Sequence, residues 1–398
     1  MGLVDIERLK GIIGAENVKD DKADLYVYGS DSSVHQAMPW VVVRPHTIEE
    51  VQNVMRYANP RLIPVIARGA GSGMSGQAVP IKGGIVMDFK KMNKILEINL
   101  EDTFVRVEPG VVDDDLNRAL KPHNVFYPPA PASSRIATIG GEIANNASGV
   151  RSVKYGAVRD SVLGMRVVLA NGDLIDVGAK TRVQATGYQL ERLMVGSEGT
   201  LGIIVEATLK IVPIPKFRCL GMAKFNKLED AGNSISEVMS SGINLSMLEL
   251  MDNIAITAVN KAQNLGLPDV EAILLFEADG MAKEAVDIEI QKIIEICKKQ
   301  NGFGIDLSYD AKERAKIYAG RKKLFPSLSR FKDYFTCASL ADDMAVPYSK
   351  MAETAQKIHE IAKRNNVIMT AYGHCGSGCM HTKILMDPRK KSQWEDAK

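Results

Sequence analysis

The chain has 398 residues, which is more than one ordinary hydrophobic core organises, so we expect two domains. Its 45% hydrophobic and 25% charged residues are typical of a soluble globular protein, and a net charge of +2 argues against a nucleic-acid partner or a membrane-binding face. No apolar run is long enough to span a membrane, and five cysteines without Cys-x-x-Cys spacing argue against a disulfide framework and predict a cytoplasmic protein.

The N-terminal part predicts a small β-α-β unit. The expected elements are a helix over Ile6–Ile13, an irregular lead-in ending at Tyr26–Asp31, a strand at Trp40–Val43, a helix that begins at the capping box Thr47–Glu50, and a strand at Ile63–Ala67.

A glycine-rich loop, Arg68–Gly76, follows that strand. Its stretch Gly71–Gly76 fits the pattern G-x-G-x-x-G, which in nicotinamide-binding proteins opens a helix. Here Pro80 and the pair Gly83-Gly84 leave no room for a helix before the next strand, Ile85–Phe89. We therefore expect the free amides of the loop, rather than the end of a helix, to bind a pyrophosphate. The alternative is an ordinary surface loop.

The remainder of the first domain alternates strands with irregular segments. We expect strands at Ile95–Asn99 and Phe104–Glu108, a helix at Val112–Leu120, a proline-rich loop at Tyr127–Ser134, a small polar segment at Thr138–Gly149, a hairpin turning at Asn171-Gly172, a glycine-rich segment at Arg192–Ile204, and a strand at Glu206–Val212. Pro213–Pro215 is the predicted domain boundary.

The second half predicts an antiparallel sheet covered by helices, an α+β domain of ferredoxin-like type. The expected strands are Cys219–Phe225, Met247–Leu250, Val270–Glu277 and Ala341–Val346. The expected helices are Leu228–Ser240, Asn253–Ala262, Ala282–Lys299 and Tyr348–Asn365.

Four segments together resemble the flavin-binding motifs of the vanillyl-alcohol-oxidase (PCMH-type) superfamily. They are Arg68–Gly76, Tyr127–Ser134, Thr138–Gly141 and Gly196–Ile203. Within it, the chain is most similar to the branch of the glycolate oxidase flavin subunit, D-lactate dehydrogenase and D-2-hydroxyglutarate dehydrogenase. The resemblance implies a two-part FAD-binding domain at residues 1–214 and an α+β substrate domain at 215–398 that roofs the flavin ring.

The resemblance also implies a set of FAD contacts. The pyrophosphate would be held by Arg68, Gly69, Ala70, Gly71, Ser72, Gly73, Met74, Ser75 and Gly76. The flavin and ribityl region would meet Pro131, Ser133, Ser134, Thr138, Gly140 and Gly141. Glu198, Gly199 and Ile203 would meet the adenine side or the flavin ring through their backbones. Apart from the resemblance, the side-chain amide of Asn145 is suited to bind a heterocycle. For Asn145, ordinary turn chemistry is the alternative. The loop lacks the histidine of covalent members, so we expect noncovalent FAD.

The segment Gly373–His381 resembles the metal-binding motif of that branch. His374 and His381 match its two histidine ligands, and the implied ion is divalent, with zinc favoured by the sulfur of the neighbouring cysteines. Two structural histidines are the alternative, and we expect Cys375 and Cys379 to be small apolar residues rather than ligands. Arg321 matches the arginine that binds the substrate carboxylate in the family, although a merely solvated arginine is equally consistent with the sequence.

The motif departs from the family at two positions, where Ser377 and Cys379 replace an aspartate and an asparagine. The family continues with a Glu-His-Gly-Ile-Gly-like segment that carries a third metal ligand and a base, and nothing similar precedes Lys398. Either the protein is naturally short here or the sequence is a fragment of a longer chain, and as it stands the predicted site is incomplete.

The leading hypothesis is an FAD-dependent dehydrogenase of a D-2-hydroxy acid such as lactate or glycolate. Its electrons would pass to a quinone, an iron–sulfur subunit or a flavoprotein rather than to NAD, and any membrane association would be peripheral, through a partner. A flavin-binding subunit without catalysis is the second hypothesis. A related oxidase of sugars or phenols is the third, and the Gly373–His381 segment argues against it.

Overall fold

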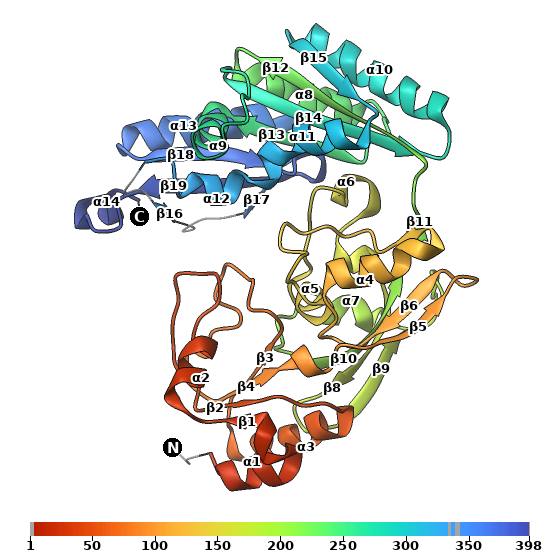
Figure 1. Ribbon diagram of the computed structural model, residues 1–398, viewed down its shortest axis with the longest axis vertical. Helices are drawn as coiled ribbons and strands as arrows, with labels where there is room; N and C mark the ends of the chain where they lie inside the picture. Colours follow the sequence, from red (N-terminus) through yellow and green to blue (C-terminus); the bar gives the residue numbers. More distant parts are fainter. Residues whose placement is uncertain (1–3, 333–335, 339–342, 398) are drawn as a thin grey trace. The chain divides into compact units, whose positions relative to one another are not determined.

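A computed structural model describes residues 4–332, 336–338 and 343–397, and the chain divides into two compact units (Figure 1). The first unit comprises Met1–Gly149 and Gly156–Ile214, and the second comprises Val150–Tyr155 and Pro215–Lys398. The inclusion of Val150–Tyr155 in the second unit differs from the predicted boundaries. Its short helix α6 (Ser152–Tyr155) is attached to a strand of that unit by an ion pair of 2.5 Å between Lys154 Nζ and Asp279 Oδ1.

The first unit begins with a four-stranded sheet in the order β1-β2-β4-β3. Its strands are β1 (Val18–Lys19), β2 (Val41–Val43), β3 (Val65–Arg68) and β4 (Ile85–Asp88). Strand β4 lies parallel to both β2 and β3. Alternate residues of β2 face opposite sides of the sheet, where helices α1 (Ile6–Ile13) and α3 (Ile48–Ala58) cover one face and α2 (Lys22–Tyr28) packs on the other.

The second sheet of this unit has the order β5-β6-β10-β8-β9 and is antiparallel throughout. Its strands are β5 (Ile95–Asn99), β6 (Phe104–Val107), β8 (Val162–Val168), β9 (Leu174–Gly178) and β10 (Ile203–Lys210), and a separate ribbon pairs β7 (Val125–Phe126) with β11 (Val212–Pro213). A bulge between Ile204 and Glu206 interrupts β10, whose Ile203 and Val205 pack with the first sheet's core and whose later residues pack in the second core.

Helices of the first unit fill the second core. They are α4 (Asp113–Leu120), α5 (Ile139–Asn145) and α7 (Leu190–Met194). The fully buried Ile139 and Ile143 hold α5 against this core.

The second unit is built on one large sheet with helices on both faces (Figure 1). The sheet has the order β15-β12-β14-β13-β18-β19-β16, and β17 also pairs with β19. Its strands are β12 (Phe217–Phe225), β13 (Met247–Asp252), β14 (Ala272–Gly280), β15 (Phe303–Ser308), β16 (Thr336–Ala338), β17 (Asp343–Ala345), β18 (Ile368–Gly373) and β19 (Cys379–Met386).

Two apolar clusters separate the helices of this unit by face. Helices α8 (Leu228–Ser240), α10 (Lys283–Lys299) and α13 (Met351–Arg364) pack on one face, and α9 (Asn253–Gln263), α11 (Ala311–Lys322) and α12 (Leu324–Leu328) pack on the other. The last helix is α14 (Lys391–Ala397). Successive residues of β13, such as Leu250 and Met251, contribute to opposite clusters, as expected for a strand buried on both sides.

The predicted α+β class with its two-part first domain is confirmed, and several predicted elements match closely, including helices α1 and α8. The prediction of an irregular segment at Tyr26–Asp31 is wrong, because α2 extends to Tyr28 and is capped by the side chain of Asp21. Strand β10 begins at Ile203 rather than Glu206. Of the predicted strand Ala341–Val346, residues 341 and 342 lie outside the described residues, and β17 covers Asp343–Ala345. Among the described residues no helix combines the length and apolar character that crossing a membrane requires.

Candidate functional site

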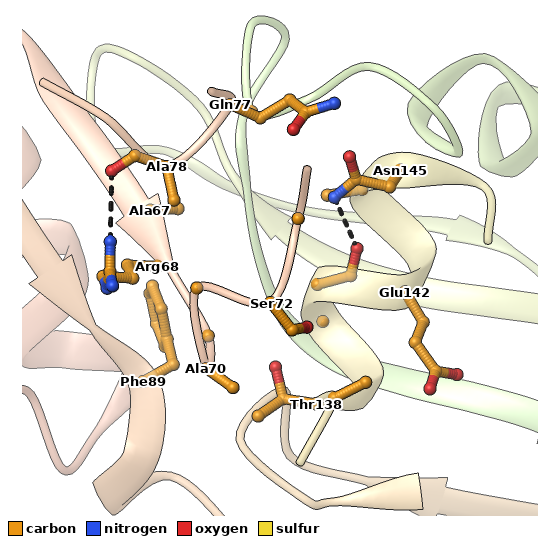
Figure 2. A pocket seen from close by; sticks show the side chains of 18 of the residues that line it. Ala67, Arg68, Ala70, Ser72, Gln77, Ala78, Phe89, Thr138, Glu142 and Asn145 are labelled. Atoms are coloured by element: carbon orange, nitrogen blue, oxygen red, sulfur yellow. Dashed lines mark hydrogen bonds between the residues drawn. The ribbon is translucent and has the colours of Figure 1, made fainter. Parts of the chain in front are cut away.

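A cavity of about 1150 Å³, counting its open mouth, lies in the first unit (Figure 2). The loop between β3 and β4 forms one wall, and the first turns of α5 form the opposite wall. No helix begins at Gly76 or elsewhere between β3 and β4, as predicted. The start of α5 also lines the cavity, through Thr138, Gly140 and Gly141, and the binding of the pyrophosphate by loop amides alone stays a prediction.

Two glycines of the loop leave the space that the cavity needs. Gly71 has φ of +68°, a conformation that L side chains rarely adopt, and a Cβ there would lie 2.2 Å from Nη2 of Arg68. A Cβ on Gly69 would lie 2.1 Å from Oγ1 of Thr138. Any side chain at either position would displace one of the polar groups that line the cavity.

Arg68 places a buried positive charge at this cavity. Among the described residues it makes no ion pair, and its guanidinium bonds only weakly to the carbonyl oxygen of Ala78, at 3.4 Å (Figure 2), and lies 5.5 Å from the ring of Tyr28. Burial lowers the pKa of Arg68, and the nearby Tyr28, Asp31 and Asp88 raise this pKa by a smaller amount. A desolvated guanidinium without a carboxylate partner is suited to bind an anionic group such as a pyrophosphate.

Other polar atoms at the cavity also lack partners. Oγ1 of Thr138 and Oε1 of Gln77 are buried and accept or donate no hydrogen bond within the described structure. Leaving such atoms unpaired costs free energy, which a bound polar ligand would recover. The glycine cradle, the unpaired arginine and these atoms fit the diphosphate and sugar of the predicted FAD.

Most residues predicted to contact FAD line this one cavity. They are Arg68, Gly69, Ala70, Gly71, Ser72, Gly73, Met74, Ser133, Thr138, Gly140, Gly141, Asn145, Glu198 and Gly199. The predicted Ser75, Gly76, Pro131, Ser134 and Ile203 are not part of its lining. Ile203 is buried in the core while Ile204 lines the cavity, because successive residues of a strand face opposite sides.

The second glycine-rich segment, Arg192–Ile204, is hydrogen-bonded to α5. The amide of Gly196 donates to the carbonyl oxygen of Ile143, and the amide of Glu198 donates to that of Ala144, each at 3.0 Å. Glu198 adopts φ of +52°, which is uncommon for a residue with a side chain. These contacts bring Glu198 and Gly199 to the cavity, although they lie far from Arg68 in the sequence.

Helix α5 also carries a buried carboxyl group, that of Glu142. Glu142 is 3% exposed, and its carboxyl group lies beside that of the buried Asp113. Burial first, and then the nearby Asp113, raise the pKa of Glu142 well above its ordinary value. Figure 2 shows this side chain leaving α5 on the side away from Ser72. Glu142 was not predicted, although an acid between the apolar residues Ile139 and Ile143 was the available signal.

The pKa of Glu142 predicts how stability depends on pH. The native state keeps a proton that the unfolded chain loses above about pH 4.3, so the wild type loses stability as pH rises from there through the native pKa. Glu142→Gln has no such proton. We expect the stabilisation of the variant over the wild type to grow by up to about 1.4 kcal/mol per pH unit in that window.

Urea unfolding of the flavin-free protein at about pH 5 and about pH 8 measures this effect. Glu101→Gln, at an exposed position, is the control. A difference between Glu142→Gln and the wild type that is the same at both pH values would show that Glu142 is ionised in the native protein.

The second unit brings the predicted C-terminal residues together around a carboxylate that was not predicted. Glu249 of β13 is completely buried; its Oε1 lies 2.7 Å from Nδ1 of His374, and its Oε2 accepts from Nε of Arg321 at 2.6 Å. Burial alone would raise the pKa of Glu249, but the charges of His374 and Arg321 outweigh it and lower the pKa. The guanidinium of Arg321 also lies 5.0 Å from the ring of Tyr372.

His381 has a carboxylate partner as well. Its Nδ1 bonds to Oδ1 of Asp343, and its ring centre lies 5.0 Å from that of His374, with the two rings nearly perpendicular. When Nδ1 of a histidine faces a carboxylate, Nε2 is left to bind a metal ion or a substrate. The donor set therefore fits the predicted divalent ion.

The two cysteines of this segment differ in position. Cys375 is fully buried in the core shared with α8 and α13, as expected of a small apolar residue. Cys379 is only partly buried, and its sulfur and the ligand atoms of Asp343 and His381 all lie within 4.8 Å of one another. Sequence analysis missed Asp343, because only the pairing of β17 with β19 places it opposite His381.

Two family models match the chain. The model described as "FAD binding domain" matches residues 39–178, and the model described as "FAD linked oxidases, C-terminal domain" matches residues 214–398. The first match contains the loop and most of the cavity, and the second contains Glu249, Arg321 and the segment from His374 to His381.

Curated relatives are similar over nearly the whole chain. The glycolate oxidase subunit GlcD of Bacillus subtilis (strain 168) is 36% identical over 98% of this chain and 82% of its own length. The mitochondrial D-lactate dehydrogenase [cytochrome] of Arabidopsis thaliana is 32% identical over 98% of this chain and 68% of its own.

Solved structures share the fold at lower identity. The structure of p-cresol methylhydroxylase with substrate bound matches with a TM-score of 0.81 at 20% identity, covering 98% of this chain and 84% of that one. An alkyldihydroxyacetonephosphate synthase matches with a TM-score of 0.79 at 21% identity, covering 98% and 82%.

Proposed function

Because this chain belongs to the family of FAD-linked oxidases, we propose that it binds FAD noncovalently in its first unit and oxidises a small D-2-hydroxy acid. Lactate and glycolate are the favoured substrates, since the Bacillus subtilis and Arabidopsis thaliana relatives are named for them. The electrons would pass to an acceptor other than NAD. The Bacillus subtilis relative is named as a subunit, which supports an acceptor on a partner chain, such as an iron–sulfur protein.

The observation that carries the proposal is Arg68, a buried arginine without an ion pair beside a glycine loop. Its guanidinium would bind the diphosphate together with the amides of Gly69 to Gly73, and Thr138 Oγ1 would bond to the same ligand. The other predicted residues that line the cavity stay assigned to FAD as part of this proposal. When bound, FAD would accept the hydride of the hydroxy acid, which carries the two electrons of the oxidation.

The proposed hydroxy-acid site is in the second unit. Arg321 donates Nε–H to Glu249, and its terminal N–H groups would bind the substrate carboxylate. Glu249 fixes both Arg321 and His374, so it acts as a positioning residue. His374 and His381 would hold a divalent cation, which, when bound, lowers the pKa of the substrate hydroxyl.

The test is anaerobic mixing of the purified, FAD-loaded protein with D-lactate, L-lactate or glycolate in turn, with and without added zinc. We expect D-lactate or glycolate to bleach the flavin absorbance, and L-lactate to leave it oxidised. The variant Arg321→Lys keeps a charge but loses the planar fork, so a higher substrate concentration for half-reduction is expected.

The outcomes separate the hypotheses. A protein that takes up no FAD contradicts the proposal as a whole. Bound FAD that no 2-hydroxy acid reduces, with or without zinc, contradicts the substrate assignment and favours a flavin-binding subunit without catalysis.

A further inference from the structure

Strands β17 and β19 place three different metal-binding groups on one patch of the second unit. In their antiparallel pairing Asp343 lies opposite His381, and Ala345 lies opposite Cys379. Cys379 and His381 are two residues apart on one strand, so their side chains leave the same face of the sheet. One ligand atom from each of Asp343, Cys379 and His381 lies within 4.8 Å of the other two.

We infer that a divalent zinc ion is bound by the sulfur of Cys379 together with His381 and Asp343. This ligand set differs from the two-histidine pair expected from the sequence, and it rests on the same C-terminal site as the proposed function. A sulfur, an imidazole nitrogen and a carboxylate oxygen are all ligands of zinc, and a thiolate selects zinc over manganese or magnesium.

The distances are compatible with one shared ion. Zinc–ligand bonds of about 2.0–2.3 Å place tetrahedral ligands within about 4 Å of one another, so the three groups need only small side-chain movements to close around zinc. In the present structure Asp343 is hydrogen-bonded to Nδ1 of His381. Zinc binding would break this hydrogen bond, or the Asp343 side chain would rotate so that Asp343 and His381 both reach the ion.

His374 has a different place in this arrangement. Its Nδ1 is engaged by the buried Glu249, and its ring centre lies 5.0 Å from that of His381. It is therefore adjacent to the three ligands and could occupy a fourth position, which a substrate oxygen would otherwise take.

Zinc binding has a simple proton balance. The thiol of Cys379 loses its proton to solvent as the Zn–S bond forms, and no atom is oxidised or reduced. The other cysteine of the segment cannot substitute, because Cys375 is fully buried in the apolar core behind the strand.

X-ray absorption at the zinc edge of the FAD-loaded, zinc-loaded protein tests the inference. We expect one sulfur neighbour at about 2.3 Å beside nitrogen and oxygen neighbours at about 2.0–2.2 Å. Cys379→Asn should remove the sulfur neighbour, and Cys375→Ala should retain it. Asp343→Asn should weaken zinc binding by about 10-fold or more in a competition titration with a chelator.

Several outcomes would overturn the inference: no zinc retained by the wild type, no sulfur neighbour, or a sulfur neighbour that survives Cys379→Asn. Zinc affinity unchanged by Asp343→Asn would remove Asp343 from the ligand set. Because the measurement reads bond lengths and does not require turnover, it can fail while hydroxy acids still bleach the flavin, and it can succeed where they do not.

Discussion

Replacing Glu249 with alanine is expected to lower the free energy of unfolding by about 3–5 kcal/mol, because it leaves Arg321 buried without its partner. The same change removes the acceptor for Nδ1 of His374, so the ring loses the contact that fixes its orientation. If His374 takes the fourth position of the zinc site, zinc affinity should then fall by about 10–100-fold. Urea unfolding followed by circular dichroism measures the first effect, and chelator competition measures the second.

Two further variants isolate the cause. Glu249→Gln keeps the shape and one hydrogen bond but loses the charge, so we expect an intermediate loss of stability. Glu353→Ala removes an acid that pairs with Lys350 and Lys357 on the exposed surface of α13 and should change stability little. If Glu249→Ala unfolded at the same urea concentration as Glu353→Ala, the buried network would not contribute as described.

The second large effect concerns Arg68. Arg68→Met is expected to weaken FAD binding by about 10–150-fold, since a hydrogen bond to a charged group contributes about 1.5–3 kcal/mol. Without flavin, the variant should be as stable as the wild type or more stable, because it removes a buried charge that has no ion pair in the described structure. Titration of the apoprotein with FAD, followed by flavin fluorescence, gives the affinity.

Arg61→Met is the matched control, because Arg61 is exposed and contacts only Tyr57 in the described structure, through its carbonyl oxygen and ring. FAD affinity should be unchanged in this variant. An Arg68→Met protein that binds FAD as tightly as the wild type, or that no longer folds without flavin, would assign Arg68 a structural role instead.

Local sequence patterns predicted the elements whose signals lie within a few residues. Helix α8 and the strand–loop–strand order around Arg68–Gly76 are of this kind, because periodicity and proline placement act over short distances. Helix α5 was not predicted, since Gly140 and Gly141 each disfavour a helix by about 1 kcal/mol. The burial of Ile139 and Ile143 in the second core overrides that preference.

The site residues that sequence analysis missed depend on contacts between distant segments. Glu249 joins Arg321 and His374, which are 72 and 125 residues away, and Asp343 meets His381 across 38 residues. Such pairings follow from strand register and sheet order, which a single sequence does not reveal. Ile204 lines the cavity in place of Ile203 for a similar reason, since the alternation of β10 decides which of the two faces it.

A crystal structure of the protein grown with FAD tests the central claim most directly. We expect the diphosphate to lie between the loop of Gly69–Gly73 and the start of α5, within about 3 Å of loop amides and with the guanidinium of Arg68 bonded to it. A diphosphate located elsewhere, or a cavity that stays empty in the presence of saturating FAD, would show that this loop does not bind the flavin.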